Sequence, residues 1–292
     1  MTWRQTLACI ATALLLAACR AQPPANQSFF FVQMSDPQFG FITPNAGFKQ
    51  ETDNFSKAIA AANRLRPAFV VVTGDLTHRQ GDSAQIAAYR RIIAQLDPAI
   101  VVYNVPGNHD LALPLSPASI AAYRRVFGPD YYEFDSHGMH GIVINSSLFK
   151  EPSLAPNEAA AQEAWLRSRL DAARAKNSRV IVFQHHPWFL TSADEPDQYY
   201  NLPLARRREF LDLFARSGVT HVFAGHYHRN ALGKDGALEM VTTGPVGKPL
   251  GADSSGVRIV VADRGRIAHF YYALDSIPGQ VPGARYPVPR SR

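Results

Sequence analysis

Five short motifs rich in aspartate, asparagine and histidine constrain this chain more than any other feature, because each follows directly on an apolar run. The runs cover residues 29–34, 69–73, 100–105, 180–184 and 220–224. They are rich in β-branched and aromatic residues and are followed by turn formers, which is the pattern of buried strands. Polar groups that recur at the ends of buried strands predict an α/β fold whose strand ends form one site.

The motifs supply seven groups that can bind metal. They are Asp36, Gln38, Asp75, Asn108, His185, His226 and His228. Carboxylate, amide and imidazole groups form a mixed ligand set that suits Mn, Fe, Zn or Mg. Seven ligands are too many for one tetrahedral ion, and they fit two ions about 3.5–4 Å apart. Such a pair of cations activates a shared water and binds the oxygens of an in-line displacement at phosphorus. The sequence therefore predicts hydrolysis of phosphate esters.

Taken in order, the motifs resemble those of the calcineurin-like metallophosphoesterases over residues 29–275. That family's pattern is Asp-x-His, Gly-Asp, Gly-Asn-His-Asp/Glu, His and Gly-His-x-His, and the ordered set is far more specific than any single motif. A narrower resemblance, to the subgroup of calcineurin-like phosphoesterase domain-containing proteins, implies a serine/threonine phosphatase. It is carried by SDPQFG at 35–40, VFQH at 182–185, YNL at 200–202, GHYHRN at 225–230, LEMV at 238–241 and GVRIV at 256–260.

The resemblance implies that two divalent ions share one carboxylate, Asp75. The first ion would be bound by Asp36, Gln38, Asp75 and His228. The second would be bound by Asp75, Asn108, His185 and His226. It also implies a four-layer α/β/β/α sandwich, and hydrolysis of phosphate monoesters through in-line attack by a hydroxide that bridges the two ions.

Two residues beside the ligands are implied to take part in catalysis. His109 resembles the family's histidine that stabilises the transition state or protonates the leaving oxygen, and Asp110 would orient it. Asn108 and His109 would also contact the substrate, since Asn108 can reach both a metal and a phosphate oxygen.

The chain departs from the broad family at one ligand, because Gln38 stands where the usual histidine would be. An amide oxygen is neutral and harder than imidazole, so it favours hard ions and leaves the identity and occupancy of the first metal open. The subgroup shares this glutamine. In addition, His78 occupies the position of the tyrosine ligand of purple acid phosphatases, which argues against a tyrosinate–iron site.

Several of these residues also have purely structural interpretations. Asp36 and Asp75 could be helix N-caps, although the repeated motifs favour ligands. We expect His186 to be a structural or surface histidine and the run 206–208 to lie on the solvated face of a helix rather than in a phosphopeptide site. Four aromatic residues could line a substrate mouth or simply pack a loop. They are Trp188, Phe189, Tyr199 and Tyr200.

The N-terminus has the features of a bacterial lipoprotein signal. Arg4 precedes an apolar run over residues 7–18, which is too short for a comfortable membrane span. The run ends in LAAC at 16–19, which resembles a lipobox. Cleavage before Cys19 would leave a lipidated cysteine; the alternative is an ordinary secretory signal cut near Ala21. Residues 19–28 then form a tether, and Arg20 after the cysteine favours the periplasmic side of the outer membrane.

Residues 29–275 are predicted to form one domain, with residues 276–292 as a flexible tail rich in Pro, Gly and Arg. Helices are expected at 52–64, 83–95, 117–127, 158–175 and 204–216. A hairpin is expected at 131–134 and 141–145, with strands at 238–243, 257–262 and 267–272. The formal net charge of +6 agrees with an anionic substrate. The sequence has no basic stripe with interleaved aromatic residues, the pattern that would indicate nucleic-acid binding.

Three functions remain open at this stage. A phosphate monoesterase, with a phosphoprotein as one substrate, is favoured. A cyclic-nucleotide or other phosphodiesterase is the alternative within the enzymes, because one scaffold hosts both. A metal-binding envelope lipoprotein that has lost catalysis is the third, and only Gln38 supports it. The pattern does not specify the oligomeric state.

Overall fold

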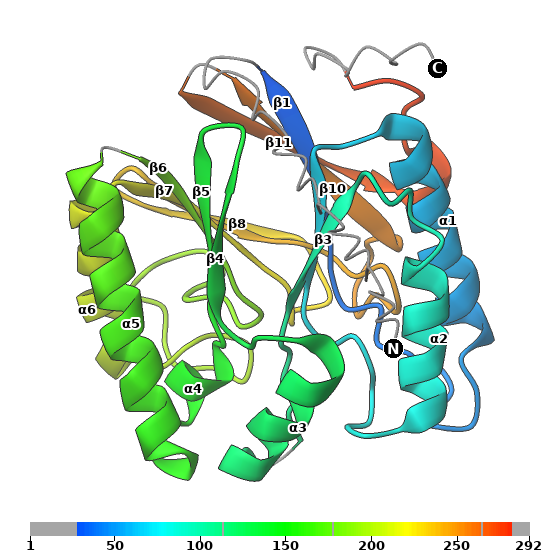
Figure 1. Ribbon diagram of the computed structural model, residues 1–292, viewed down its shortest axis with the longest axis horizontal. Coiled ribbons are helices and arrows are strands. Elements are labelled where there is room, and N and C mark those ends of the chain that lie inside the picture. The colour runs from blue at the N-terminus through cyan, green and yellow to red at the C-terminus, as the bar shows by residue number, and fades with distance from the viewer. Residues whose placement is uncertain (1–27, 113, 177, 264, 282–292) are drawn as a thin grey trace, which may run out of the picture.

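The computed structural model describes residues 28–112, 114–176, 178–263 and 265–281. Two β-sheets lie face to face between two pairs of helices, which gives the predicted four-layer α/β/β/α sandwich (Figure 1). Cys19, the predicted signal segment 1–18, the predicted tether up to residue 27 and residues 282–292 lie outside the described residues. None of the described helices is long and apolar enough to cross a membrane.

The first sheet has the strand order β11-β10-β1-β2-β3. Its parallel centre consists of β1 (Phe29–Met34), β2 (Phe69–Thr73) and β3 (Val101–Val105). The hairpin of β10 (Gly256–Asp263) and β11 (Arg266–Ala273) extends it, with β10 antiparallel to β1. The outer face is covered by α1 (Lys49–Leu65) and α2 (Ser83–Ile93).

The second sheet has the order β4-β5-β6-β7-β9-β8. Its strands are β4 (Tyr132–Ser136), β5 (Met139–Val143), β6 (Arg179–Phe183), β7 (Val219–Ala224), β8 (Ala231–Asp235) and β9 (Leu238–Thr242). Of these, β5, β6, β7 and β9 run parallel. The outer face is covered by α5 (Pro156–Ala175) and α6 (Leu204–Arg216), while α3 (Pro117–Phe127) and α4 (Ser147–Lys150) lie at one end (Figure 1).

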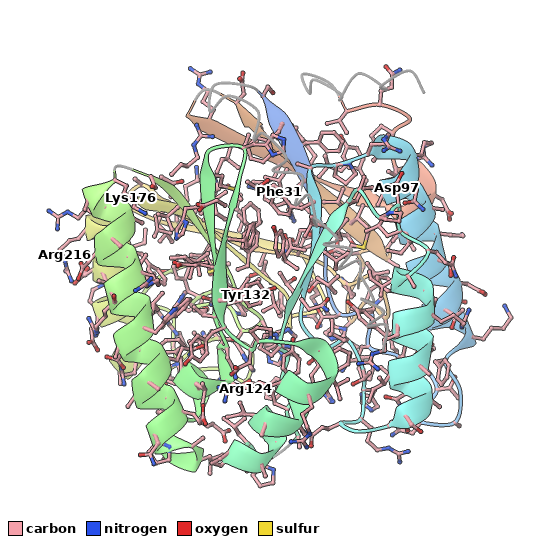
Figure 2. The ribbon with its side chains drawn as sticks, viewed as in Figure 1. Phe31, Asp97, Arg124, Tyr132, Lys176 and Arg216 are labelled. Carbon is pink, nitrogen blue, oxygen red and sulfur yellow. The ribbon has the colours of Figure 1, made fainter. Side chains whose placement is uncertain are left out.

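Three apolar layers hold the sandwich together. Between the sheets, Phe31 stacks on Phe69 and meets Phe183 edge-on, and all three side chains are at most 1% exposed. The other two layers lie between each sheet and its helices. Figure 2 shows this continuous side-chain packing around Phe31. Because β1, β2 and nearly all of β6 are buried on both faces, their sequences are mainly apolar and do not alternate between apolar and polar residues.

Local signals set the helix boundaries. Asp82 accepts hydrogen bonds from the amides of Ala84 and Gln85 and so begins α2, and Ser116 forms a capping box ahead of Pro117 in α3. The bounds predicted from the sequence for most helices and strands agree with the observed bounds to within a few residues. The prediction missed the edge strand β8, and the packed chain runs past the predicted boundary at 275, because Val281 is buried against the first core.

A histidine between the sheets makes the fold sensitive to acid. Burial lowers the pKa of His221 to about 4; the charge of Glu239 opposes this shift, and the charge of His269 adds to it. The unfolded chain therefore binds more protons between pH 6.5 and 4, so stability is lost as the pH falls through that window. We expect wild type to lose about 3 kcal/mol more than His221→Gln between pH 7 and pH 4, measured by urea unfolding. Parallel losses in the two proteins would contradict this.

Candidate dimetal centre

The strand ends of both sheets meet at one edge of the sandwich. Asp36, Asp75 and Asn108 follow β1, β2 and β3, while His185 and His226 follow β6 and β7. Backbone hydrogen bonds join these turns, from Asp36 N to Gly74 O at 3.2 Å and from Gly225 N to His185 O at 3.0 Å. Parallel strands point their carboxyl ends the same way, so motifs far apart in sequence converge.

The turns that carry the ligands have an unusual backbone. Asp36, Gln38, Asp75, His226 and His228 all have positive φ, between 40° and 68°. Such a conformation costs about 1–3 kcal/mol at a non-glycine residue and persists where the surroundings enforce it. Helices begin elsewhere, at Lys49 and Ser83, so Asp36 and Asp75 are not helix caps.

Five of the seven predicted ligands make up two overlapping groups that share Asp75. One group is Asp75, His185 and His226, and the other is Asp36, Asp75 and His228; within each, the ligand atoms lie within 4.8 Å of one another. Asn108 joins the first group, with its Oδ1 3.0 Å from Nε2 of His185. All seven predicted side chains are at most 5% exposed.

The histidines are held so that one ring nitrogen of each faces the cluster. Nδ1 of His185 lies 2.8 Å from the carbonyl of Thr73, and Nδ1 of His228 lies 2.6 Å from that of Lys248. Each Nδ1–H donates to its carbonyl, so Nε2 is the nitrogen left to bind a metal, once it has released any proton that it carries. His226 is reversed, with Nε2 3.4 Å from the carbonyl of Tyr199 and Nδ1 towards His185.

The side-chain oxygen of Gln38 is available to bind a metal, because it lacks a hydrogen-bond partner among the described residues. Nε2 of Gln38 lies 3.3 Å from Oδ2 of Asp75, whereas its buried Oε1 has no hydrogen-bond partner. An orphaned buried oxygen is costly unless something absent from the protein atoms completes it. A divalent cation at the group of Asp36, Asp75 and His228 would do so, and the donor set therefore suits two divalent ions.

The charges within the cluster depend on one another. Burial alone would raise the pKa of Asp75, but the positive charges of His185 and His109 outweigh it and hold that pKa far below its usual range. For His185, burial works towards a lower pKa, and Asp75 reverses this and raises it to about 9. Asp75 is thus the ionised group on which the cluster is centred.

The His185 ring lies so close to the backbone of residue 74 that only glycine fits there. Gly74 has φ +87°, and a Cβ there would lie 2.4 Å from Nδ1 of His185. We expect Gly74→Ala to displace His185 and lower bound metal to one ion or fewer per chain, as measured by elemental analysis. Gly81→Ala is the matched control, because Gly81 has φ +73° but open space around it. Equal metal content in both variants would contradict the role of Gly74.

His109 lies next to the cluster but is oriented differently from the sequence-based expectation. Its Nδ1 lies 2.8 Å from the carbonyl of His78, its ring stacks on the His78 ring at 4.8 Å, and its amide donates to Asp75 Oδ1 at 3.0 Å. The expectation that Asp110 orients His109 is therefore wrong, because the His78 carbonyl holds the ring.

Asp110 instead ties two ligand turns together. Its buried carboxylate accepts hydrogen bonds from the amides of Leu76, Thr77 and Gly107, at 3.1, 3.0 and 2.9 Å. Burial and the charge of Asp75 raise the pKa of Asp110 to about 7 in spite of these bonds. Asp110 is a positioning residue for the turns of Asp75 and Asn108, not a catalytic one.

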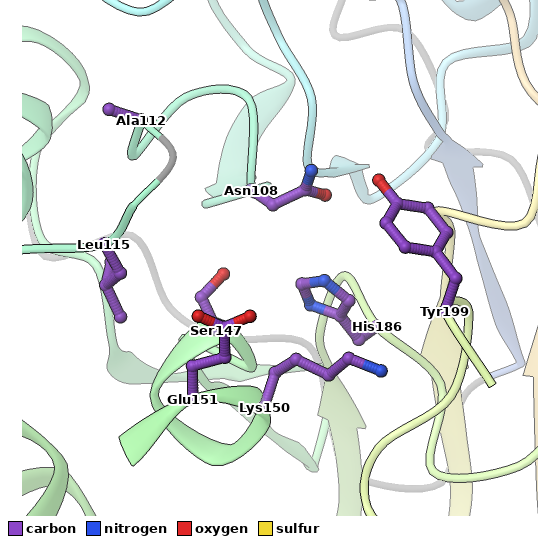
Figure 3. A pocket seen from close by; sticks show the side chains of 8 residues that line it. All are labelled: Asn108, Ala112, Leu115, Ser147, Lys150, Glu151, His186 and Tyr199. Atoms are coloured by element: carbon purple, nitrogen blue, oxygen red, sulfur yellow. The ribbon is translucent and has the colours of Figure 1, made fainter. Parts of the chain in front are cut away.

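A small hollow, which we call the side hollow, opens beside Asn108 (Figure 3). Its volume is about 80 Å³. Its main lining residues are Asn108, Leu115, Ser147, Lys150, His186 and Tyr199. Sequence reasoning missed Ser147 and Lys150 and placed His186 outside the site, although its position next to a ligand histidine was a usable signal.

The remaining alternatives are settled by burial. Trp188 and Phe189 are fully buried and pack the loop, whereas Tyr199 is 61% exposed and lies over His226, with ring centres 4.9 Å apart. The solvated-face prediction fails at Arg207, which is buried and donates to the carbonyls of Ala193, Glu195 and Leu202.

Comparisons with known proteins agree with this geometry. The family described as Calcineurin-like phosphoesterase matches residues 31–230. The human serine/threonine-protein phosphatase CPPED1 is 38% identical over 266 residues, covering 85% of each chain. Among solved structures, GAP50, the anchor in the inner membrane complex of Plasmodium, superposes with a TM-score of 0.64 at 13% identity and 85% coverage of each chain. A dimetal phosphatase from Danio rerio gives 0.57 at 18% identity, covering 86% of this chain and all of that one.

Proposed function

This chain belongs to the calcineurin-like phosphoesterase family, and we propose that it is a phosphatase for phosphoserine and phosphothreonine in proteins. Hydrolysis of phosphoric esters follows from the family. The observation that carries the mechanism is the pair of buried ligand groups that share Asp75. Support for the substrate is the name of the human relative, which is 38% identical over 85% of both chains.

The residues divide the work of hydrolysis among them. Asp36, Gln38, Asp75 and His228 would hold one divalent ion, and Asp75, Asn108, His185 and His226 the other. When bound, two such ions supply positive charge for the phosphate oxygens and lower the pKa of a water. Asn108 would hold a phosphate oxygen; its position in the wall of the side hollow and against His185 supports this role.

We assign protonation of the leaving oxygen to His109. Its Nδ1–H is committed to the His78 carbonyl, which leaves Nε2 to carry the proton that is transferred. The His78 carbonyl stabilises the positively charged ring, and the amide bond to Asp75 fixes the distance between His109 and the metal groups.

Three classes of ester test the proposal. The metal-loaded chain is expected to hydrolyse a phosphoserine peptide and p-nitrophenyl phosphate, with the diester bis-p-nitrophenyl phosphate at least about tenfold slower in kcat/KM. Dominant turnover of the diester or of cyclic nucleotides would replace this proposal with a phosphodiesterase. Omitting metal, and adding Mn, Fe, Zn and Mg singly, identifies the ion that supports turnover.

We also propose that a lipid on Cys19 anchors the chain to the outer membrane on its periplasmic side. The LAAC sequence at 16–19 supports the lipid. Phe29, at the end of β1 opposite Asp36, stacks on His137 of the β4–β5 turn. A hollow of about 540 Å³ beside Gly138 of that turn is lined by Arg174, Arg179 and Arg216. Basic side chains favour an anionic membrane surface, so the catalytic edge would face away from the bilayer.

Fractionation tests this anchor. The wild-type chain is expected in the membrane pellet and, after density-gradient separation, in the outer-membrane fraction. Cys19→Ala should release it or leave an unprocessed signal. An unchanged distribution and processed size of Cys19→Ala would overturn the lipid anchor in favour of an ordinary signal cleavage.

A further inference from the structure

The side hollow contains a histidine whose proton position can be assigned from its neighbours. Ser146 Oγ accepts hydrogen bonds from the amides of His185 and His186, at 3.3 and 2.8 Å. Its own proton is left to donate to Nδ1 of His186, 3.0 Å away. An imidazole that accepts at Nδ1 carries its proton at Nε2.

That Nε2–H is available to a ligand. Across the described part of the chain, Nε2 of His186 has no hydrogen-bond partner, and Figure 3 shows the ring facing the open space between Asn108 and Lys150. The His186 ring lies 4.3 Å from the His226 ring, centre to centre. The free donor therefore stands directly beside a metal-ligand residue.

A second donor lines the same hollow. Ser147 is 6% exposed, and its buried Oγ has no hydrogen-bond partner. In Figure 3 its hydroxyl points into the hollow towards Asn108. A buried hydroxyl left unpaired costs about 1–3 kcal/mol, so the hollow has two unmet polar groups close to the phosphate site.

The rest of the wall limits what can bind. Lys150 is occupied, because its Nζ donates to the carbonyls of Gln198 and Asn201 at 2.7 and 2.6 Å, which holds the loop that carries Tyr199. Leu115 and the Tyr199 ring add apolar surface, and the exposed Glu151, which also lines the hollow, disfavours a negatively charged ligand group there. Two neutral donors in a small, partly apolar hollow suit an uncharged acceptor oxygen with a short carbon chain.

We propose that the side hollow binds the alcohol part of the substrate, with Ser147 and His186 donating hydrogen bonds to a carbonyl on the carbon next to the phosphorylated carbon. This inference rests on the proposed phosphatase function and names the chemical class of its substrate. Phosphoserine and phosphothreonine in a polypeptide have that carbonyl at the required position. Phosphotyrosine and p-nitrophenyl phosphate have an aromatic ring there instead.

A ratio of two substrates tests the proposal. N-acetylphosphoserine methylamide and p-nitrophenyl phosphate would be compared for wild type, Ser147→Ala and His186→Phe. We divide kcat/KM for the phosphoserine compound by kcat/KM for p-nitrophenyl phosphate. Each variant is expected to lower this ratio about tenfold, mainly through a higher KM for the phosphoserine compound. Ser153→Ala is the matched control, since Ser153 is an exposed serine on the same segment. Equal losses on both substrates, or an unchanged ratio, would overturn the assignment.

Binding without catalysis gives an independent measurement. Saturation-transfer NMR with N-acetylserine methylamide and the metal-free chain should show contact in wild type and Ser153→Ala, and much less in Ser147→Ala and His186→Phe. If wild type hydrolyses neither ester, the proposed function is wrong. The NMR contrast between variants still decides whether the hollow binds the alcohol, and its absence would reject that role.

Discussion

Replacing Asp75 by asparagine is expected to reduce hydrolysis of p-nitrophenyl phosphate by about 10³-fold or more, equivalent to about 4 kcal/mol. Asp75 belongs to both ligand groups, and a neutral amide cannot supply the negative charge that two cations share. Metal content measured on the same preparations should fall from two ions to one or none per chain.

The control for this change is Asp53→Asn, which removes an exposed carboxylate that pairs with Lys49. It should retain both ions and full activity. If Asp75→Asn kept two ions and more than about a tenth of wild-type activity, Asp75 would not be the shared ligand.

The second large effect is expected at His109. We expect His109→Gln to lower kcat by about 10²–10⁴-fold while both metals stay bound, because proton transfer to the leaving oxygen is lost and no ligand is removed. The loss should be smaller for p-nitrophenyl phosphate, whose leaving group needs little protonation, than for a phosphoserine peptide.

Asp110→Asn separates catalysis from positioning. Because Asp110 accepts from the amides of Leu76, Thr77 and Gly107, its loss should lower metal content and thermal stability as well as activity. If His109→Gln also lost metal, or if its loss of kcat were the same for both leaving groups, His109 would not be the proton donor.

The sequence was sufficient to predict the candidate ligands and the strands where metal-binding residue types directly follow apolar runs. Asp36, Asp75, His185, His226 and His228 follow apolar runs, and parallel strands must bring such positions to one edge. The same runs predicted the two sheets, since strands buried on both faces need apolar residues throughout. The ordered motifs then supplied the topology through family resemblance.

Properties that depend on partners distant in sequence escaped prediction. Arg207 lies in a run of charged helix residues, and only the loop at 193–202, folded across the helix, supplies the carbonyls that bury it. Asp110 follows His109 directly, yet its carboxylate faces the Asp75 turn instead. The edge strand β8, with one buried residue among its five, has too little apolar pattern to be recognised.

The central claim is that two divalent ions bind around Asp75 and that both are required for phosphate-ester hydrolysis. It is tested most directly by titrating the metal-stripped chain with the preferred ion while bound metal and p-nitrophenyl phosphate hydrolysis are followed together. We predict saturation at two ions per chain, with activity that needs the second equivalent. Full activity at one ion per chain, or binding of two ions with no hydrolysis of any ester, would contradict the account.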